Sequence, residues 1–272
     1  MTTQAGTVPA TGPVALFVET VALCGRRLRR LRRSPGRLVG MVMNPLVMLV
    51  AVGYLFEGAL VSPGTGSYID YLMAGVVLQV GLAGIGPTAI SASMDVHGGL
   101  MDRFRSLPIS RAAVLAGHAI SDTVAGIAGL LAVTGVGLVL GWRPHAGALD
   151  VAAGFGVVIV FIHVMAWVGI LIGLLVRSVE SIDSIGALVV VLFTFLSNVV
   201  FPTSAMPGWL RPVVDWNPVS AVATVIRRLW GAPGQDVPGF AGDHASAVLM
   251  ITVGALLLAT SWLSVRRLRA AD

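Results

Sequence analysis

The sequence contains no lysine, and all 18 of its basic residues are arginine. A nucleotide-binding P-loop places a lysine on the β- and γ-phosphates of its nucleotide, so this chain cannot form one. Any ATP that drives the protein must therefore be hydrolysed by a separate polypeptide. The single cysteine, Cys24, excludes a disulfide framework and a zinc site built on thiolates. The five histidines are scattered, with no pair at metal-ligand spacing, so we expect no metal site.

Charged residues are also scarce, at 11% of the 272 residues, whereas 56% are hydrophobic. About a quarter of the residues in a soluble domain carry charge, so a bilayer is the environment that fits this composition. The net charge of +5 is interpreted as membrane topology. Nucleic acid is not an expected partner, because basic patches with interleaved aromatic residues are absent. The first 13 residues are polar and rich in proline and glycine, and we expect them to be disordered.

Long apolar segments recur along the chain. A helix needs about 20 apolar residues to cross the hydrocarbon core, and six segments reach this length. They lie near 38–57, 71–94, 118–142, 151–176, 184–202 and 245–265. The sequence therefore predicts an all-α integral membrane protein with six transmembrane helices.

Arginine counts in the connecting segments give the orientation, since cytoplasmic loops carry the excess of positive charge. With six spans, fourteen arginines fall on the side that holds both termini, and four fall on the other side. Both termini are therefore expected in the cytoplasm, with residues 266–272 as a basic tail. The expected location is the cell membrane, crossed several times.

Residues 14–33 have the pattern of an amphipathic helix. One apolar stripe recurs at steps of three and four, and most of the arginines lie off it; the stripe consists of Phe17, Val21, Cys24, Leu28 and Leu31. Such a helix lies in the headgroup region with its guanidinium groups on anionic lipid. The alternative is a basic helix that is merely solvated. We prefer the interfacial helix, with membrane lipid as its partner.

No arrangement of side chains indicates a catalytic site, but polar groups occur at membrane depth. Asp122 stands out, with His118 one turn before it on the same helical face. The pair could form a proton relay, or it could face water or a helix–helix contact near the cytoplasmic side, which we prefer. A substrate path could be lined by Asn44, Gln79, Asp122, His163 and Asn198. More often, uncharged groups of this kind join helices by hydrogen bonds.

The cytoplasmic loop between the second and third spans, residues 95–111, combines alternating charge with apolar residues and a proline. A short amphipathic helix there would be a natural docking site for a partner. The residues that we assign to it are Asp95, Gly98, Asp102, Arg103, Phe104, Arg105, Leu107, Pro108 and Arg111.

The long outer segment after the fifth span is punctuated by proline and tryptophan. Trp209, Trp216 and Trp230 are expected to anchor at the membrane interface, and residues 218–230 are predicted to form a helix with Arg227 and Arg228 at one end. We expect an outer cap that contains Pro202, Pro207, Trp209, Trp216, Asn217 and Pro218.

Two motifs resemble a known family, the type 2 ABC export permeases, in particular the daunorubicin- and doxorubicin-resistance branch. The first is Met101-Asp-Arg-Phe-Arg-Ser-Leu-Pro-Ile-Ser-Arg111. The second runs through Phe201-Pro202-Thr203, Met206-Pro-Gly-Trp-Leu210 and Asp215-Trp-Asn-Pro-Val219. One departure is Asp95-Val-His-Gly98, where many permeases of the wider class carry a Glu-Arg-Glu run.

The resemblance implies a permease domain over residues 38–265 that exports a small lipophilic compound, such as an antibiotic or a secondary metabolite. Two permease chains, identical or sister, would bind two cytoplasmic ATPase subunits, which would hold ATP and magnesium; this chain would bind no cofactor. The loop at 95–111 would be the coupling helix, and short re-entrant helices would cap the exit. The alternatives are a lipid or glycan exporter of the same architecture, a proton-coupled secondary transporter that uses Asp122, and a membrane anchor without transport.

Overall fold

The structure, a computed structural model, describes residues 13–32, 35–56, 67–97, 111–203, 206–232 and 240–270. The regular elements in these ranges are all helices, so the all-α prediction is confirmed for this part of the chain. The helices in chain order are α1 (Pro13–Arg32), α2 (Pro35–Phe56), α3 (Tyr68–His97), α5 (Arg111–Val139), α6 (Ala148–Leu175), α7 (Val179–Phe195), α8 (Arg211–Asp215), α9 (Pro218–Trp230), α10 (Phe240–Asp243) and α11 (Ala245–Ala270).

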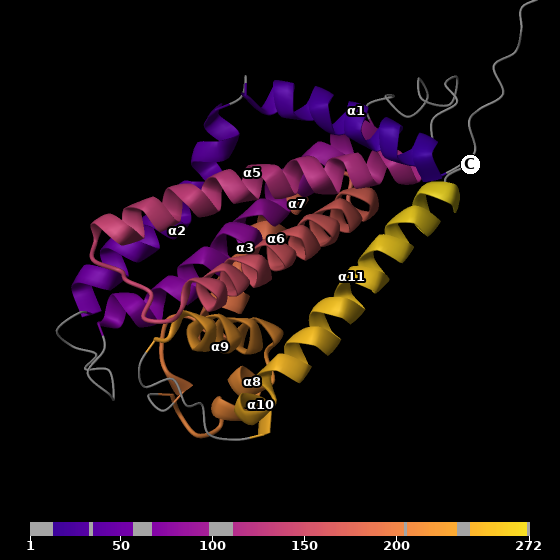
Figure 1. Cartoon of the computed structure of the whole chain (residues 1–272). Helices are drawn as coiled ribbons and strands as arrows, with labels where there is room; N and C mark the ends of the chain where they lie inside the picture. The colour runs from indigo at the N-terminus through magenta and orange to yellow at the C-terminus, as the bar shows by residue number, and fades with distance from the viewer. Residues whose placement is uncertain are drawn as a thin grey trace, which may run out of the picture.

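Helix α3 is the centre of a bundle (Figure 1). It packs against α2, α5, α6, α7 and α9, most extensively against α6, and 83% of its most apolar window is buried within the protein. Helix α11 is the opposite case, with only 11% of its window buried. An apolar helix with so little protein contact requires a lipid environment, as the composition predicts.

Among the described residues, four helices are long and apolar enough to cross a membrane: Tyr68–Val96, Ala113–Val139, Ala148–Leu175 and Ala245–Leu268. They support a multi-pass membrane protein. The first expected span corresponds to a shorter apolar helix, Val39–Leu55. The fifth span was predicted to extend to residue 202, but helix α7 ends at Phe195.

Polar side chains explain why α7 ends there. The Ser197 hydroxyl donates to the carbonyl of Thr194, and the Asn198 backbone N–H donates to Ser220 Oγ on α9 rather than to the preceding helical turn. Serine and asparagine compete with the helical hydrogen bonds in this way. The chain therefore turns while it is still within the apolar segment.

Glycines let α3 and α6 approach closely. A Cβ atom added to Gly169 would lie 2.8 Å from the carbonyl oxygen of Ile85, and one added to Gly173 would overlap the backbone of Ala89. This four-residue spacing of small residues is typical of close packing between membrane helices. The pair therefore serves helix packing.

Helices α8, α9 and α10 gather at one end of the bundle, and α1 lies at the opposite end (Figure 1). The predicted helix over 218–230 is confirmed as α9: Asn217 Oδ1 accepts from the Val219 N–H at its start, and Gly231 ends it with a φ of +66°. Trp209 and Trp216 are exposed, but Trp230 is only 1% exposed. The prediction that Trp230 anchors at the interface is wrong, because its ring packs 4.9 Å from the Trp142 ring inside the protein.

Candidate functional site

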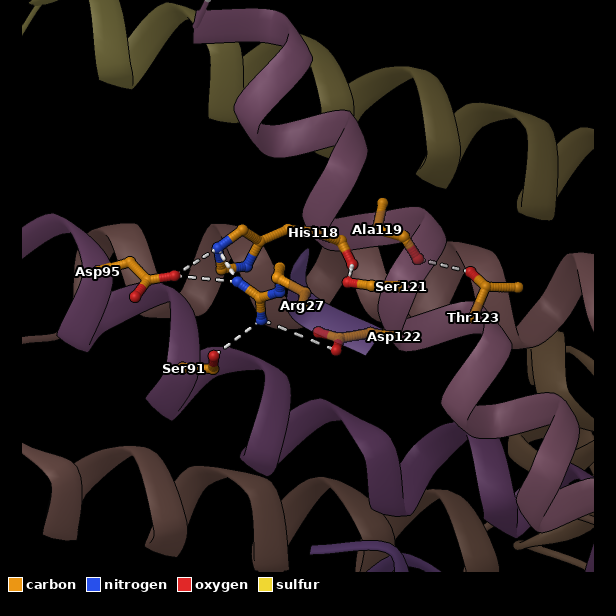
Figure 2. A network of polar contacts seen from close by, with 8 residues as sticks. All are labelled: Arg27, Ser91, Asp95, His118, Ala119, Ser121, Asp122 and Thr123. Carbon is orange, nitrogen blue, oxygen red and sulfur yellow. Dashed lines mark hydrogen bonds and ion pairs between the residues drawn. The ribbon is translucent and has the colours of Figure 1, made fainter. Parts of the chain in front are cut away.

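A cluster of ionisable side chains joins three helices at the end of the bundle where α1 lies. Arg27 comes from α1, Ser91 and Asp95 from the last turns of α3, and His118 and Asp122 from α5 (Figure 2). Arg27 Nη1 donates to Asp95 Oδ2 over 2.9 Å, and Nη2 donates to Ser91 Oγ over 2.8 Å. We call these five residues the Arg27 cluster.

The second half of the cluster lies on α5. His118 Nε2 lies 2.7 Å from Asp95 Oδ2 and also touches Arg27 Nη1. Asp122 Oδ1 lies 3.8 Å from Arg27 Nη2. One guanidinium thus faces carboxylates on two different helices.

Burial makes these contacts important. The side chains of Arg27 and Asp95 are 14% and 16% exposed, and that of Asp122 is 4% exposed. Charges removed from water are tolerated only when opposite charges and hydrogen bonds compensate them. The cluster is therefore an ionic joint between helices, and separating its members would leave a buried charge unpaired.

The cluster borders the predicted coupling segment. Helix α3 ends at His97 and α5 begins at Arg111, so residues 98–110 connect two helices that Arg27 holds together. The predicted Gly98, Asp102, Arg103, Phe104, Arg105, Leu107 and Pro108 lie outside the described residues. The assignment of Asp95 to the loop is corrected, because Asp95 belongs to the last turn of α3 and faces Arg27.

The predicted stripe of α1 is described only in part, because the side chains of Phe17 and Leu31 lie outside the described ones. The buried positions of this helix include Thr20 and Cys24, whereas Val21 is 54% exposed. The expectation that the arginines of α1 face lipid fails for Arg27, because carboxylates on two neighbouring helices attract its guanidinium inward. The prediction treated α1 in isolation and missed this pairing.

The described residues assigned to a substrate path take part in several different contacts between helices. Gln79 Nε2 on α3 donates to Thr194 Oγ1 on α7 over 3.3 Å. Asn198 Nδ2 donates to Thr224 Oγ1 on α9 over 3.0 Å. Asn44 lies on an exposed position of α2, and Asp122 belongs to the Arg27 cluster.

His163 of α6 takes part in a chain of hydrogen bonds whose directions are fixed. Trp167 Nε1–H donates to His163 Nε2 over 3.1 Å. The Thr123 hydroxyl of α5 donates to the Ala119 carbonyl, so it must accept from His163 Nδ1 over 2.9 Å. The ring is thereby held neutral with its proton on Nδ1. The contact joins α5 to α6.

A second buried arginine organises the outer cap. Arg227 of α9 is 1% exposed. Its Nε donates to the Tyr71 carbonyl over 3.1 Å, and its Nη2 donates to the carbonyls of Asn198 and Val199 over 2.7 and 3.2 Å. Asn217 adds a bond from Nδ2 to the Leu196 carbonyl over 2.7 Å. These contacts hold α9 on α3 and on the turn that follows α7.

Residues 18–229 match the family described as ABC-2 type transporter. The chain belongs to this family. It is 32% identical over 246 residues to a daunorubicin resistance ABC transporter permease protein of Streptomyces coeruleorubidus, with 84% of this chain and 87% of the relative covered. A probable doxorubicin resistance ABC transporter permease protein of Mycobacterium tuberculosis is 24% identical over 223 residues, covering 78% and 77%. A putative transport permease of Pyropia yezoensis is 25% identical over 222 residues, covering 80% and 76%.

This ABC-2 permease is accordingly a membrane transport subunit and not the ATPase of its transporter, as the missing lysine already indicated. Membership implies an ATPase partner and a pair of permease chains in general. The resemblance drawn from the two motifs is confirmed.

Two features of the permease were not predicted: the inward guanidinium of Arg27 and the burial of Arg227. A signal for the first existed, since buried carboxylates such as Asp122 require a cation nearby. No comparable signal marked Arg227, because its partners are backbone carbonyls, which every residue carries.

Proposed function

We propose that this chain is the transmembrane subunit of an exporter that moves a lipophilic compound, an antibiotic or a secondary metabolite, out across the cytoplasmic membrane. A separate ATPase drives the export. The observation that carries the proposal is the 32% identity over most of both chains to a permease named for daunorubicin resistance. A second relative named for doxorubicin resistance supports the same substrate class.

The proposed assembly contains two permease chains, either identical or sister subunits, and two cytoplasmic ATPase subunits that bind ATP and magnesium. Helices α2 and α7 complete the six spans, with both termini in the cytoplasm. Helix α1 lies at the membrane surface, with the exposed Arg26 near anionic headgroups. The excess of arginine on the side of the termini supports this orientation.

Energy enters through residues 98–110, which form the coupling segment. These residues connect α3, the most buried span, to α5. Closure of the ATPase subunits would push this segment, and the push would be transmitted to the centre of the bundle as a rigid-body movement. The outer cap around α9 would then open the exit, and the polar residues of the spans would line the substrate path in the assembled pair.

The proposal is tested in inside-out membrane vesicles that contain this chain and its ATPase. Doxorubicin, whose fluorescence reports its accumulation, is the probe. We expect ATP-dependent uptake in the wild type and its loss in Arg105→Ala and in Pro108→Ala, with both variants still present in the membrane. Undiminished uptake in these variants would rule out the coupling assignment.

The same vesicles separate the proposal from a proton-coupled transporter that uses Asp122. ATP-driven uptake should survive a protonophore and stop when ATP is withheld. Uptake that persists without ATP and collapses with the proton gradient would favour the secondary transporter. ATP-driven uptake of lipid or glycan precursors, without uptake of doxorubicin, would favour an exporter of those compounds with the same architecture.

A further inference from the structure

We propose that Arg27 is a positioning residue for energy coupling. It fastens α1 to both helices that flank the coupling segment, so that the three helix ends move as one body. The inference rests on the proposed function, because it concerns how a push on residues 98–110 reaches the spans.

The Arg27 guanidinium contacts two helices besides its own. Helix α1 packs mainly along α5, but the Arg27 side chain also reaches α3, where Nη1 binds Asp95 and Nη2 binds Ser91. Nη2 also faces Asp122 of α5 at 3.8 Å (Figure 2). A planar fork can serve partners on two helices at once, whereas a lysine offers one point of charge.

The carboxylate partners of Arg27 lie on the two helices that flank the coupling segment. Asp95 lies two residues before the end of α3, and Asp122 lies in the fourth turn of α5. Any displacement of the coupling segment acts first on these two helix ends. With Arg27 in place, α1, α3 and α5 cannot separate there without leaving a buried charge unpaired or exposing it to solvent. The displacement is therefore passed to α1 and to both spans together. Without Arg27, the contact between His118 and Asp95 still joins α5 to α3, but the ionic link to α1 is lost and less of the push reaches the spans.

A native cysteine can report whether α1 stays packed against α5. Cys24 is the chain's only cysteine, is 9% exposed and lies three residues before Arg27 on the buried side of α1. If α1 separates from α5, the thiol becomes accessible to a maleimide reagent. This measurement needs neither the ATPase nor a substrate.

The decisive comparison is between Arg27→Gln and Arg29→Gln, which remove the same charge from the same helix. Arg29 is exposed and serves as the matched control. We expect Arg27→Gln to raise the rate of Cys24 labelling about tenfold, because α1 should separate from α5 more often and expose the thiol. In the complex with the ATPase, doxorubicin uptake per ATP hydrolysed should fall about tenfold, a typical size for a coupling between sites. ATP hydrolysis itself should persist, and Arg29→Gln should resemble the wild type.

Conservative variants distinguish positioning from packing. Arg27→Met keeps the apolar stem, so it would restore coupling if stem packing were the whole role; we expect it to behave like Arg27→Gln. Arg27→Lys keeps the charge and should recover part of the uptake per ATP. If Arg27→Gln does not accumulate in the membrane, Asp122→Asn carries the test, since it removes the ion pair between Arg27 and α5 while His118 keeps its contact with Asp95. A fall in uptake per ATP is again expected.

The outcomes separate this inference from the proposed function. A wild type without ATP-dependent uptake overturns the proposed function and the inference with it. A wild type that transports, together with Arg27→Gln or Asp122→Asn coupled as tightly as Arg29→Gln, overturns the inference alone. Full restoration of coupling by Arg27→Met also overturns it.

Discussion

The guanidinium carbon of Arg227 lies 3.7 Å from the centroid of the Tyr71 ring, so a cation from α9 rests on an aromatic face of α3. The Tyr71 hydroxyl donates to the Asn198 carbonyl over 2.5 Å, and that carbonyl also accepts from Arg227 Nη2. One arginine and one tyrosine thus hold together α3, α9 and the turn after α7. Because these elements are far apart in the sequence, the outer cap depends on this contact.

Replacing Arg227 should therefore destabilise the protein. Arg227→Met should lower the free energy of unfolding by about 2–4 kcal/mol, because it removes hydrogen bonds from a charged donor, a cation–π contact and the partner of several buried carbonyls. Denaturation in detergent, followed by tryptophan fluorescence, measures the change. Arg228→Gln is the control: Arg228 is exposed and bonds only to the Gly242 carbonyl among the contacts described, over 2.9 Å, so we expect about 1 kcal/mol or less. Equal effects of the two variants would contradict the assigned role of Arg227.

Gly154 of α6 should tolerate no side chain, because the Trp230 ring occupies the space. A Cβ atom there would lie 2.8 Å from Trp230 Cδ1 and 3.2 Å from Cε2, and Trp230 Nε1 donates to the nearby Val151 carbonyl over 3.3 Å. Gly154→Ala should cost about 1–3 kcal/mol of stability by overpacking. Gly156→Ala, on the same helix with nothing within 4 Å, should be neutral or stabilise by up to about 1 kcal/mol through helix propensity. Thermal unfolding of the two variants in parallel tests this difference. An equal loss of stability in both variants would contradict the steric explanation.

Local patterns predicted the outer helix well and its surroundings poorly. The helix predicted at 218–230 is α9, Pro218–Trp230, and its ends are set by features that act within a few residues: an asparagine cap, a proline at the first position and a glycine after the last. The burial of Trp230 depends on Trp142 and Phe155, which lie at a distance in the sequence. A tryptophan near a membrane end has the same local pattern whether it faces lipid or a neighbouring aromatic ring.

The errors elsewhere have a similar physical cause. Hydropathy runs through Val199 and Val200 without interruption, so the break at Ser197 and Asn198 was invisible to a window average. Arg27 belongs to an arginine-rich helix, and only the three-dimensional approach of α3 and α5 distinguishes it from its neighbours. The coupling loop was predicted at 95–111 from its motif, and its role stays a prediction.

The Cys24 thiol should lose its proton at a higher pH than an ordinary cysteine. Burial raises its pKa, and the Asp122 carboxylate raises it further, while the Arg27 guanidinium acts in the opposite direction. Since the thiolate is the reactive form, a raised pKa means less thiolate at any given pH. The alkylation rate of the detergent-solubilised protein should therefore rise with pH to a plateau, and the midpoint of that rise should lie above the usual thiol value of about 8.5.

An exposed thiol on the same helix provides the reference for that titration. Val21→Cys in a Cys24→Ala background places a cysteine three residues away, at a position that is 54% exposed in the native chain. Its midpoint should lie below that of Cys24, and its rate at pH 7 should be higher. A Cys24 midpoint at or below the reference would mean that the thiol is not buried against α5 in the isolated protein.

Gln79 should be dispensable for stability, because its polar group is poorly compensated. Its Nε2 makes one long bond of 3.3 Å to Thr194, and its Oε1 is buried without a hydrogen-bond partner among the described residues. A buried amide of this kind costs desolvation free energy that one bond between membrane helices, at about 1 kcal/mol, barely offsets. Gln79→Met, which has nearly the same volume, should leave the free energy of unfolding within about 1 kcal/mol of the wild type or raise it.

Transport then decides what the amide is for. If Gln79 only joins α3 to α7, both Gln79→Met and Thr194→Val, which removes the partner hydroxyl, should leave ATP-driven doxorubicin uptake unchanged. If its Oε1 instead meets the transported compound, Gln79→Met alone should lower uptake while the protein remains stable, since Thr194→Val leaves the amide in place. Retained stability with lost uptake in Gln79→Met would identify Gln79 as part of the substrate path, whereas a marked loss of stability would refute the energetic argument made for its burial.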